Sequence, residues 1–187
     1  MKEKLKSMLN EKRYIHSVGV SETAVKMAVR YGADTEKARI AGLLHDCAKN
    51  LTYEQSLKKC RELGVELTDV EKANYALIHA PLGAKMAETE FGITDREILH
   101  AITAHTVAGE NMSVLDKIIY LADMIEPSRD FDGVEIHRKY AFEDLDKAFL
   151  YALNESIIHN VQKGVLLHPD TVTARNNILL GNIKNNI

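Results

Sequence analysis

The chain is poor in the residues that break helices, build disulfide frameworks or cross membranes. It has 187 residues but only three prolines and two cysteines. The two cysteines, Cys47 and Cys60, form no CxxC motif, which fits a reducing compartment. No stretch approaches the roughly 18 consecutive apolar residues of a transmembrane helix, and the start, MKEKLKSMLNEKRY, lacks the apolar core of a signal peptide. We therefore expect a cytoplasmic protein without a membrane span.

The sequence also lacks a strong charge of either sign. It contains 24 basic and 27 acidic residues, for a net charge of -3. This balance is not that of a basic nucleic-acid-binding protein, so we expect no nucleic-acid partner. Hydrophobic residues make up 45% and charged residues 27%, which is typical of a globular protein. The length fits one domain, which we place over residues 1–187.

Helix signals recur along the whole chain, whereas no segment alternates apolar and polar residues over the length of a strand. Pairs with capping-box spacing predict helix starts at Thr52/Gln55, Thr68/Glu71, Thr94/Glu97 and Ser113/Asp116. Glycines predict helix ends at Gly32, Gly64, Gly92 and Gly164. We expect helices near residues 2–9, 12–31, 35–49, 53–63, 69–76, 81–90, 95–104, 114–125, 142–163 and 171–184. The sequence thus predicts an all-α fold, a single helical bundle, whose least helical stretch is 126–138.

Six residues of metal-ligand type follow one another in the order H, HD, H, H, D. They are His16, His45, Asp46, His79, His105 and Asp123. Four imidazoles and two carboxylates suffice for two transition metals, with one carboxylate bridging. Mixed nitrogen and carboxylate sites suit iron, manganese, cobalt or zinc better than magnesium or calcium. Cys47 follows the HD pair directly, and we assign it to packing.

The predicted positions of these residues favour ligation. Asp46 lies near the C-terminal end of the predicted helix 35–49, where a carboxylate faces the negative end of the helix dipole and a divalent cation would remove the conflict. Since it has two oxygens, Asp46 is our predicted bridging ligand. His79 precedes Pro81, where we expect a helix to begin. Asp123 has apolar neighbours, and a buried aspartate there is costly unless it is paired or bound to metal.

The flanking motifs add a family resemblance. YxHSxGV, AGLLHDxAK, HAPLGA, AITAHT and MSxLDKIIYLADxIEPxR, which run from about Tyr14 to Arg175, closely resemble the YqeK family of bacterial HD-domain proteins. The resemblance implies an HD-domain bundle with iron as the metal. It also implies hydrolysis of diadenosine tetraphosphate into two molecules of ADP. Two bridged metals would lower the pKa of a shared water and hold phosphate oxygens, so no other nucleophile is required.

Phosphate binding requires cations beyond the metals. Lys49 and Arg129 rank first because they flank ligand positions, and with Asp46 they are the predicted catalytic residues. The other candidates for substrate binding are Lys85, Thr106 and Arg175, and Ser17 is a further hydroxyl near a ligand. Each basic residue could instead be a solvated surface charge, and each hydroxyl could instead donate to a nearby backbone carbonyl. The remaining histidines are assigned to structural or surface positions: His100, His137, His159 and His168.

Two other functions remain open from the sequence. The same centre suits a nucleotidase or phosphodiesterase acting on mononucleotides or cyclic nucleotides. A non-catalytic nucleotide sensor is the third reading, although the complete ligand set argues against it. The oligomeric state is not determined by the sequence, with a homodimer as one option.

Overall fold

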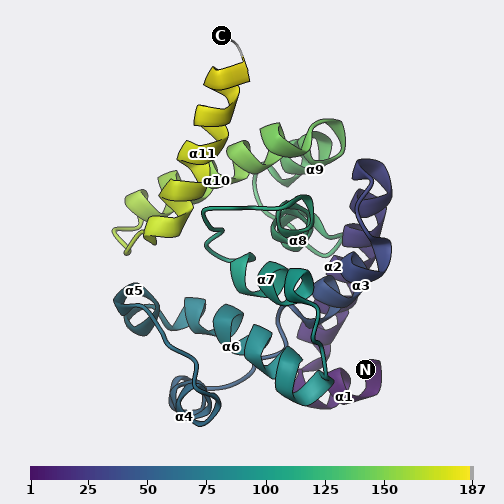
Figure 1. The fold of residues 1–187 in the computed structure, drawn as a ribbon, viewed down its shortest axis with the longest axis vertical. Helices are drawn as coiled ribbons and strands as arrows, with labels where there is room; N and C mark the ends of the chain where they lie inside the picture. Colours follow the sequence, from purple (N-terminus) through teal and green to yellow (C-terminus); the bar gives the residue numbers. More distant parts are fainter. Residues whose placement is uncertain (186–187) are drawn as a thin grey trace.

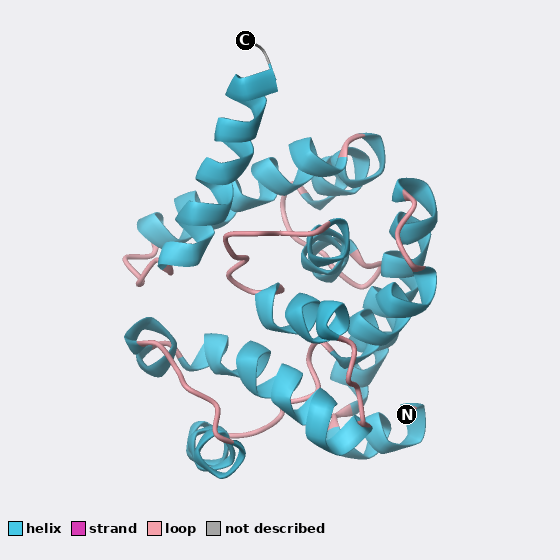
Figure 2. Cartoon of the chain, in the orientation of Figure 1, coloured by secondary structure: helices cyan, strands magenta, loops and turns pink. Residues whose placement is uncertain are grey.

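The computed structural model describes residues 1–185, which form eleven helices and no strand (Figures 1 and 2). The all-α prediction is therefore confirmed. The helices are α1 (Lys2–Met8), α2 (Glu11–Tyr31), α3 (Thr35–Leu44), α4 (Tyr53–Leu63), α5 (Asp69–Ala73), α6 (Tyr75–Phe91), α7 (Arg96–Ala104), α8 (Val114–Ile125), α9 (Val134–Glu143), α10 (Leu145–Gln162) and α11 (Pro169–Asn185).

Helix α8 lies in the middle of the bundle (Figure 1). It packs against α2, α3 and α7 on one side and against α9 and α10 on the other. Ile118, Ile119 and Leu121 of α8 are fully buried, and the ring of Tyr120 meets the edge of Phe149 from α10 with centroids 5.1 Å apart. A helix with so much buried apolar surface is fixed by packing, because hydrophobic burial is the main favourable term in folding. The residues of α8, Asp123 among them, are thus held in fixed positions next to α2, α3 and α7.

Local signals place most helix ends correctly. The predicted capping boxes are present at the starts of α4, α5 and α8. The glycines that end α2, α4 and α6 adopt left-handed conformations, with φ of 67°, 67° and 71°. Helix α7 differs from the prediction: its N-cap is Asp95 rather than Thr94, because the Asp95 carboxylate accepts the backbone N–H groups of Glu97 and Ile98.

Several predicted boundaries are wrong. Helix α3 ends at Leu44 rather than at residue 49, because tight turns follow in which Lys49 N–H bonds to the Asp46 carbonyl at 2.9 Å. Helix α6 begins at Tyr75, so Pro81 lies inside a helix instead of starting one. Residues 134–143 form a helix, α9, after Gly133 in a left-handed conformation, although we expected residues up to 138 to be the least helical. A break at Asp144 separates α9 from α10, where one helix over 142–163 was predicted.

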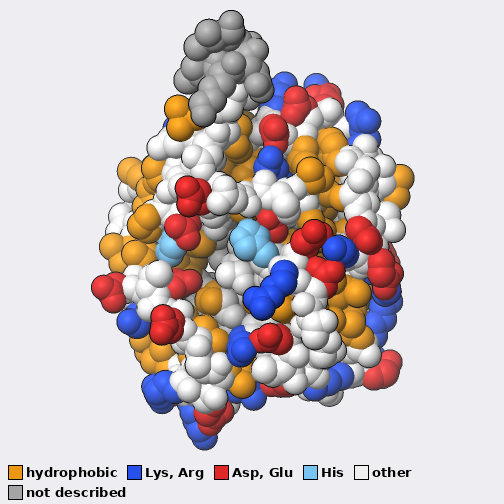
Figure 3. All heavy atoms as spheres, in the orientation of Figure 1, with side chains coloured by type: hydrophobic (Ala, Val, Ile, Leu, Met, Phe, Trp, Pro, Cys, Tyr) orange, Lys and Arg blue, Asp and Glu red, His pale blue; other side chains and the backbone are white. Residues whose placement is uncertain are grey.

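No helix within the described residues combines the length and the apolar character that crossing a bilayer demands. On the face shown in Figure 3, acidic and basic side chains are interspersed among uncharged and apolar ones. This mixed surface agrees with the small net charge of the chain, which is -3.

Candidate metal centre

The six predicted ligands converge on one place although they come from five parts of the chain. His16 lies on α2, His79 on α6 and Asp123 on α8. His45 and Asp46 follow the end of α3, and His105 follows the end of α7. The structure corrects the expected setting of two of them, since Asp46 is in a turn rather than on a helix and His79 is inside a helix rather than before one. Their ligand atoms form two overlapping groups, each within 4.8 Å: His16, His45 and Asp123, and His45, Asp46 and His105.

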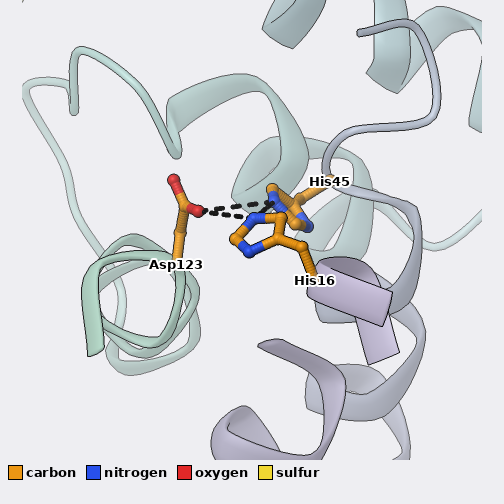
Figure 4. Close-up of side chains that lie close together, drawn as sticks. All are labelled: His16, His45 and Asp123. Atoms are coloured by element: carbon orange, nitrogen blue, oxygen red, sulfur yellow. Dashed lines mark hydrogen bonds and ion pairs between the residues drawn. The ribbon is translucent and has the colours of Figure 1, made fainter. Parts of the chain in front are cut away.

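The first group joins α2, α3 and α8 (Figure 4). Oδ1 of Asp123 lies 2.9 Å from Nε2 of His16 and 3.6 Å from Nε2 of His45. The two Nε2 atoms are 3.2 Å apart. The Asp123 side chain is 21% exposed, so it is less buried than the sequence suggested and opens toward solvent. Two nitrogens and one carboxylate oxygen thus face a common point at the edge of the core.

Asp46 stands between this group and the remaining histidines. One of its oxygens, Oδ1, lies 3.1 Å from Nε2 of His79 and 3.7 Å from Nε2 of His105. The other, Oδ2, lies 3.5 Å from Nε2 of His45. A carboxylate whose two oxygens face different pairs of imidazoles has the arrangement of a bridging ligand. His79 lies beside the second group, with its Nε2 atom 3.0 Å from that of His105.

Three of the four imidazoles are oriented by a backbone carbonyl three residues earlier. In each ring Nδ1–H donates to the carbonyl, which directs Nε2 into the cluster. These bonds run from His45 to Gly42 at 2.8 Å, from His79 to Ala76 at 2.8 Å and from His105 to Ile102 at 2.6 Å.

His16 is held by a side chain instead. Its Nδ1 atom lies 2.9 Å from Oε1 of Glu126, a residue that follows Asp123 by one helical turn and is 1% exposed. The sequence analysis did not identify Glu126. The available signal was its position in the motif IEP, three residues after a ligand, where helical periodicity returns to the same face.

The charges of the cluster suit a cation. Burial alone would raise the pKa of Asp46 and of Asp123, but the surrounding imidazoles outweigh it and hold both pKa values well below the usual range. Burial likewise lowers the pKa of His45, yet the two carboxylates outweigh this effect and raise its pKa to about 10. Burial lowers the pKa of His79 to about 4, which keeps that ring neutral. A bound cation would take the place of the His45 proton, and imidazole nitrogens beside ionised carboxylates are donors that transition metals prefer, so these residues fit such ions.

Three basic residues surround the ligands. Arg129 bonds to both the carboxylate and the carbonyl of Asp123, the latter at 2.7 Å. Lys49 Nζ lies within 3.2 Å of both ring nitrogens of His79, and burial lowers its pKa. Arg13 bonds to Oδ2 of Asp46 at 2.6 Å. Lys49 and Arg129 are among the residues predicted from the sequence. Arg13 is not, although it lies one turn before His16 on the same helix.

The other predicted substrate residues lie apart from these contacts. Lys85 pairs with Glu88 at 2.6 Å, and Arg175 donates to the side chain of Asn154 at 2.6 Å. Thr106 is half-buried in the turn directly after His105. The hydroxyl of Ser17 is buried without a hydrogen-bond partner in the described part of the chain. The structure therefore brings Lys49 and Arg129 to the cluster but gives Lys85 and Arg175 other partners.

The residues assigned to packing behave as such. Cys47 is buried and its thiol donates to the carbonyl of Gly83 at 3.3 Å. His137 packs between Phe131 and Tyr151, with ring centroids 5.7 and 4.8 Å away. Neither residue faces the ligand cluster, so neither is a seventh ligand in this arrangement.

Comparison with known proteins agrees with this arrangement. The model of the HD domain family matches residues 13–128, which include all six ligand positions. The chain belongs to the HD domain family. Its helices also superpose on the crystal structure of a Clostridium acetobutylicum protein described as a predicted HD superfamily hydrolase involved in NAD metabolism. That structure has a TM-score of 0.91 and 48% identity, covering 95% of this chain and 94% of the other.

Relatives within the family match over almost their whole length. A protein of Halalkalibacterium halodurans is 42% identical over 94% of both chains, and one of Bacillus subtilis is 39% identical over 95% of both. Each bears the name bis(5'-nucleosyl)-tetraphosphatase, symmetrical. The family resemblance drawn from the motifs is thereby confirmed.

Proposed function

We propose that this HD-domain protein is a metal-dependent hydrolase that cleaves diadenosine tetraphosphate symmetrically into two molecules of ADP. The observation that carries the proposal is the placement of Asp46, whose two oxygens face different histidines within one buried cluster. The proposal is further supported by relatives of that name that match at 42% and 39% identity from end to end. It follows that a mononucleotide is a poorer substrate than the dinucleotide.

The cluster would hold two divalent transition metals, of which iron is our first choice, with manganese, cobalt or zinc as alternatives. His16, His45 and Asp123 would hold one, and His79 and His105 the other, with Asp46 between them. When bound, such metals neutralise phosphate charge and lower the pKa of a water molecule. The protein contributes orientation, since each imidazole is fixed through its Nδ1 atom by a carbonyl or a carboxylate.

Arg13, Lys49 and Arg129 would bind the phosphate oxygens of the substrate. Arg13 and Arg129 line a cavity of about 380 Å³ that reaches His16, while Lys49 lies on the other side of the cluster beside His79. Guanidinium and ammonium groups form charge-assisted bonds to phosphate, and guanidiniums can bind it through two parallel bonds. A polyphosphate that crosses the cluster would thus meet positive charge on both sides of the metals.

The same cavity offers an aromatic surface for a nucleobase. Phe131 lines it and is 40% exposed, so its ring is accessible to a ligand in the cavity. Stacking on an aromatic side chain tolerates any base, because every base has a π-face. We therefore expect the adenines to contribute binding energy but little discrimination between purines.

The test is product analysis with metal-stripped protein that is reconstituted separately with iron, manganese, cobalt and zinc. We expect diadenosine tetraphosphate to yield ADP as sole product, with metal required, and oxygen-18 from water to enter one ADP per cleavage. ATP together with AMP would reject symmetric cleavage. Rapid hydrolysis of a mononucleotide without turnover of the dinucleotide would favour a nucleotidase. Tight binding of the dinucleotide without any turnover would indicate a sensor.

A further inference from the structure

His16 differs from the other three histidines in how its ring is held. His45 and His105 follow the ends of α3 and α7, where the last carbonyls have no partner within the helix and are free to accept Nδ1–H. His79 lies near the start of α6 and bonds to the Ala76 carbonyl of its own first turn. His16 lies inside the 21-residue helix α2 and makes no such bond to a carbonyl. Its Nδ1 atom instead meets Glu126 from the end of α8, at 2.9 Å. The orientation of His16 thus depends on a residue 110 positions away in the chain.

The Glu126 carboxylate is fixed on both oxygens. Oε2 accepts the backbone N–H of Ser128 at 2.8 Å, and Oε1 accepts the Ser128 hydroxyl as well as facing His16. Arg138 of α9 donates to the backbone carbonyls of Ile125 and Glu126, at 3.0 and 3.1 Å, and so anchors the turn that carries the carboxylate. A buried carboxylate with this many donors stays in place and stays ionised, because hydrogen bonds favour its charged form.

Gly19 makes room for this carboxylate. It follows His16 by one turn of α2, on the same face, and a Cβ atom added there would lie 2.6 Å from Oε2 of Glu126. That separation is below any ordinary contact between non-bonded heavy atoms. The next atom of Glu126, its carboxyl carbon, would be 3.3 Å away. A residue with a side chain at position 19 would therefore displace the carboxylate from the gap between α2 and α8.

We propose that Glu126 is a positioning residue that fixes the proton of His16 on Nδ1 and presents Nε2 to the metal shared with His45 and Asp123. Gly19 provides the space that the Glu126 carboxylate occupies. The inference rests on the proposed metal centre. A carboxylate that accepts the second ring N–H fixes the tautomer and raises the basicity of a ligand histidine. The effect is confined to one side of the centre, because the other three imidazoles use carbonyls of their own turns.

The expected signature is the selective weakening of one metal. In Glu126→Ala and in Gly19→Ala, we expect affinity for one of the two ions to fall by about 10- to 100-fold while the other ion is retained. Glu126→Gln keeps an oxygen that can accept Nδ1–H but loses the charge, so its loss should be smaller. Manganese titration followed by elemental analysis measures both sites on the same samples.

A second measurement needs no metal. Nitrogen-15 shifts of the histidine rings in metal-free protein report which ring nitrogen of His16 carries the proton. We expect the Nδ1–H tautomer in the wild type and in Glu126→Gln, and a mixture of tautomers in Glu126→Ala. Two control variants should behave as wild type: Gly181→Ala, where an added Cβ meets nothing within 4 Å, and Glu22→Gln, which changes an exposed carboxylate on α2.

A double variant tests whether Gly19 and Glu126 act through the same contact. If Gly19→Ala acts only by displacing the carboxylate, it should cost no further metal affinity in the Glu126→Ala background, where the Cβ atoms would be 3.6 Å apart. This comparison remains informative if Gly19→Ala alone folds poorly. Wild-type affinity for both metals in Glu126→Ala, with unchanged His16 shifts, would overturn the proposal. Failure of the wild type to bind metal would also overturn the proposal. If His16 in that protein still carried its proton on Nδ1, the proposed metal centre would be wrong and the Glu126 contact would be right.

Discussion

The two sides of the ligand cluster are held by different kinds of contact. On one side, His79 and His105 are each oriented by a carbonyl three residues earlier, so their geometry is set once the local turn has formed. On the other side, His45 is oriented in the same way, but His16 and Asp123 are held by the side chains of Glu126 and Arg129. The first side is a product of local structure, and the second exists only when α2 packs against α8. Substitutions outside the ligands should therefore damage the second side more than the first.

The largest effect is expected at Asp46, which joins the two sides. Asp46→Ala removes both oxygens that face the imidazoles, so it should abolish turnover and lower the occupancy of both metals. Helix content should stay near that of the wild type, because Asp46 lies in a turn rather than in a helix. Circular dichroism, elemental analysis and product analysis on one preparation test this. Full activity with two metals bound would show that Asp46 does not bridge.

A smaller effect is expected at the phosphate-binding residues. Lys49→Ala and Arg129→Ala each remove one charge-assisted contact worth about 1.5–3 kcal/mol, which corresponds to a loss of about 10- to 150-fold in kcat/KM. Both metals should remain, because neither residue is a ligand. Since Arg129 also bonds to Asp123, its variant should bind the His16-side metal somewhat less tightly than Lys49→Ala does. Unchanged kinetics in both variants would place the phosphates elsewhere.

The smallest effect is expected at Lys85, a predicted substrate residue that pairs with Glu88 along the surface of α6. Lys85→Ala should change kcat/KM by less than about twofold and the free energy of unfolding by no more than about 0.5 kcal/mol, as for an ordinary surface substitution. Steady-state kinetics beside urea unfolding would measure both. A loss as large as that of Lys49→Ala would show that the substrate reaches α6.

Residues found only from the structure share a simple relation to the ligands. Arg13 and Gly19 each lie three residues from His16, and Glu126 lies three residues after Asp123. Helical periodicity places such neighbours on one face, so the spacing was visible in the sequence. The spacing does not show which residue of a neighbouring helix each of these residues contacts. An arginine, a glycine and a glutamate on helix faces are ordinary residues until another helix is packed against them.

The helix errors have the same origin. The apolar run through Leu43 and Leu44 continues in pattern through Cys47 and Ala48, which are buried as well, yet the helix ends at Leu44. Periodicity reports which residues are buried and does not report that the chain turns there. Pro81 was predicted to start a helix, but it lies in the second turn of α6, where its missing N–H leaves the Leu77 carbonyl without the usual donor four residues later. In both places the local signal did not locate the helix boundary.

The sequence by itself determined the helical class and most helix ends, because these depend on residue type and on spacing within a few positions. It also predicted the six residues that the structure brings together in the cluster. Only the tertiary structure decided which ring nitrogen of His16 faces the cluster, that the two oxygens of Asp46 face different imidazoles, and that Glu126 enters the gap left by Gly19. These features join residues far apart in the chain. Their geometry depends on how α2, α3, α6, α7 and α8 pack around one buried centre, which no local pattern encodes.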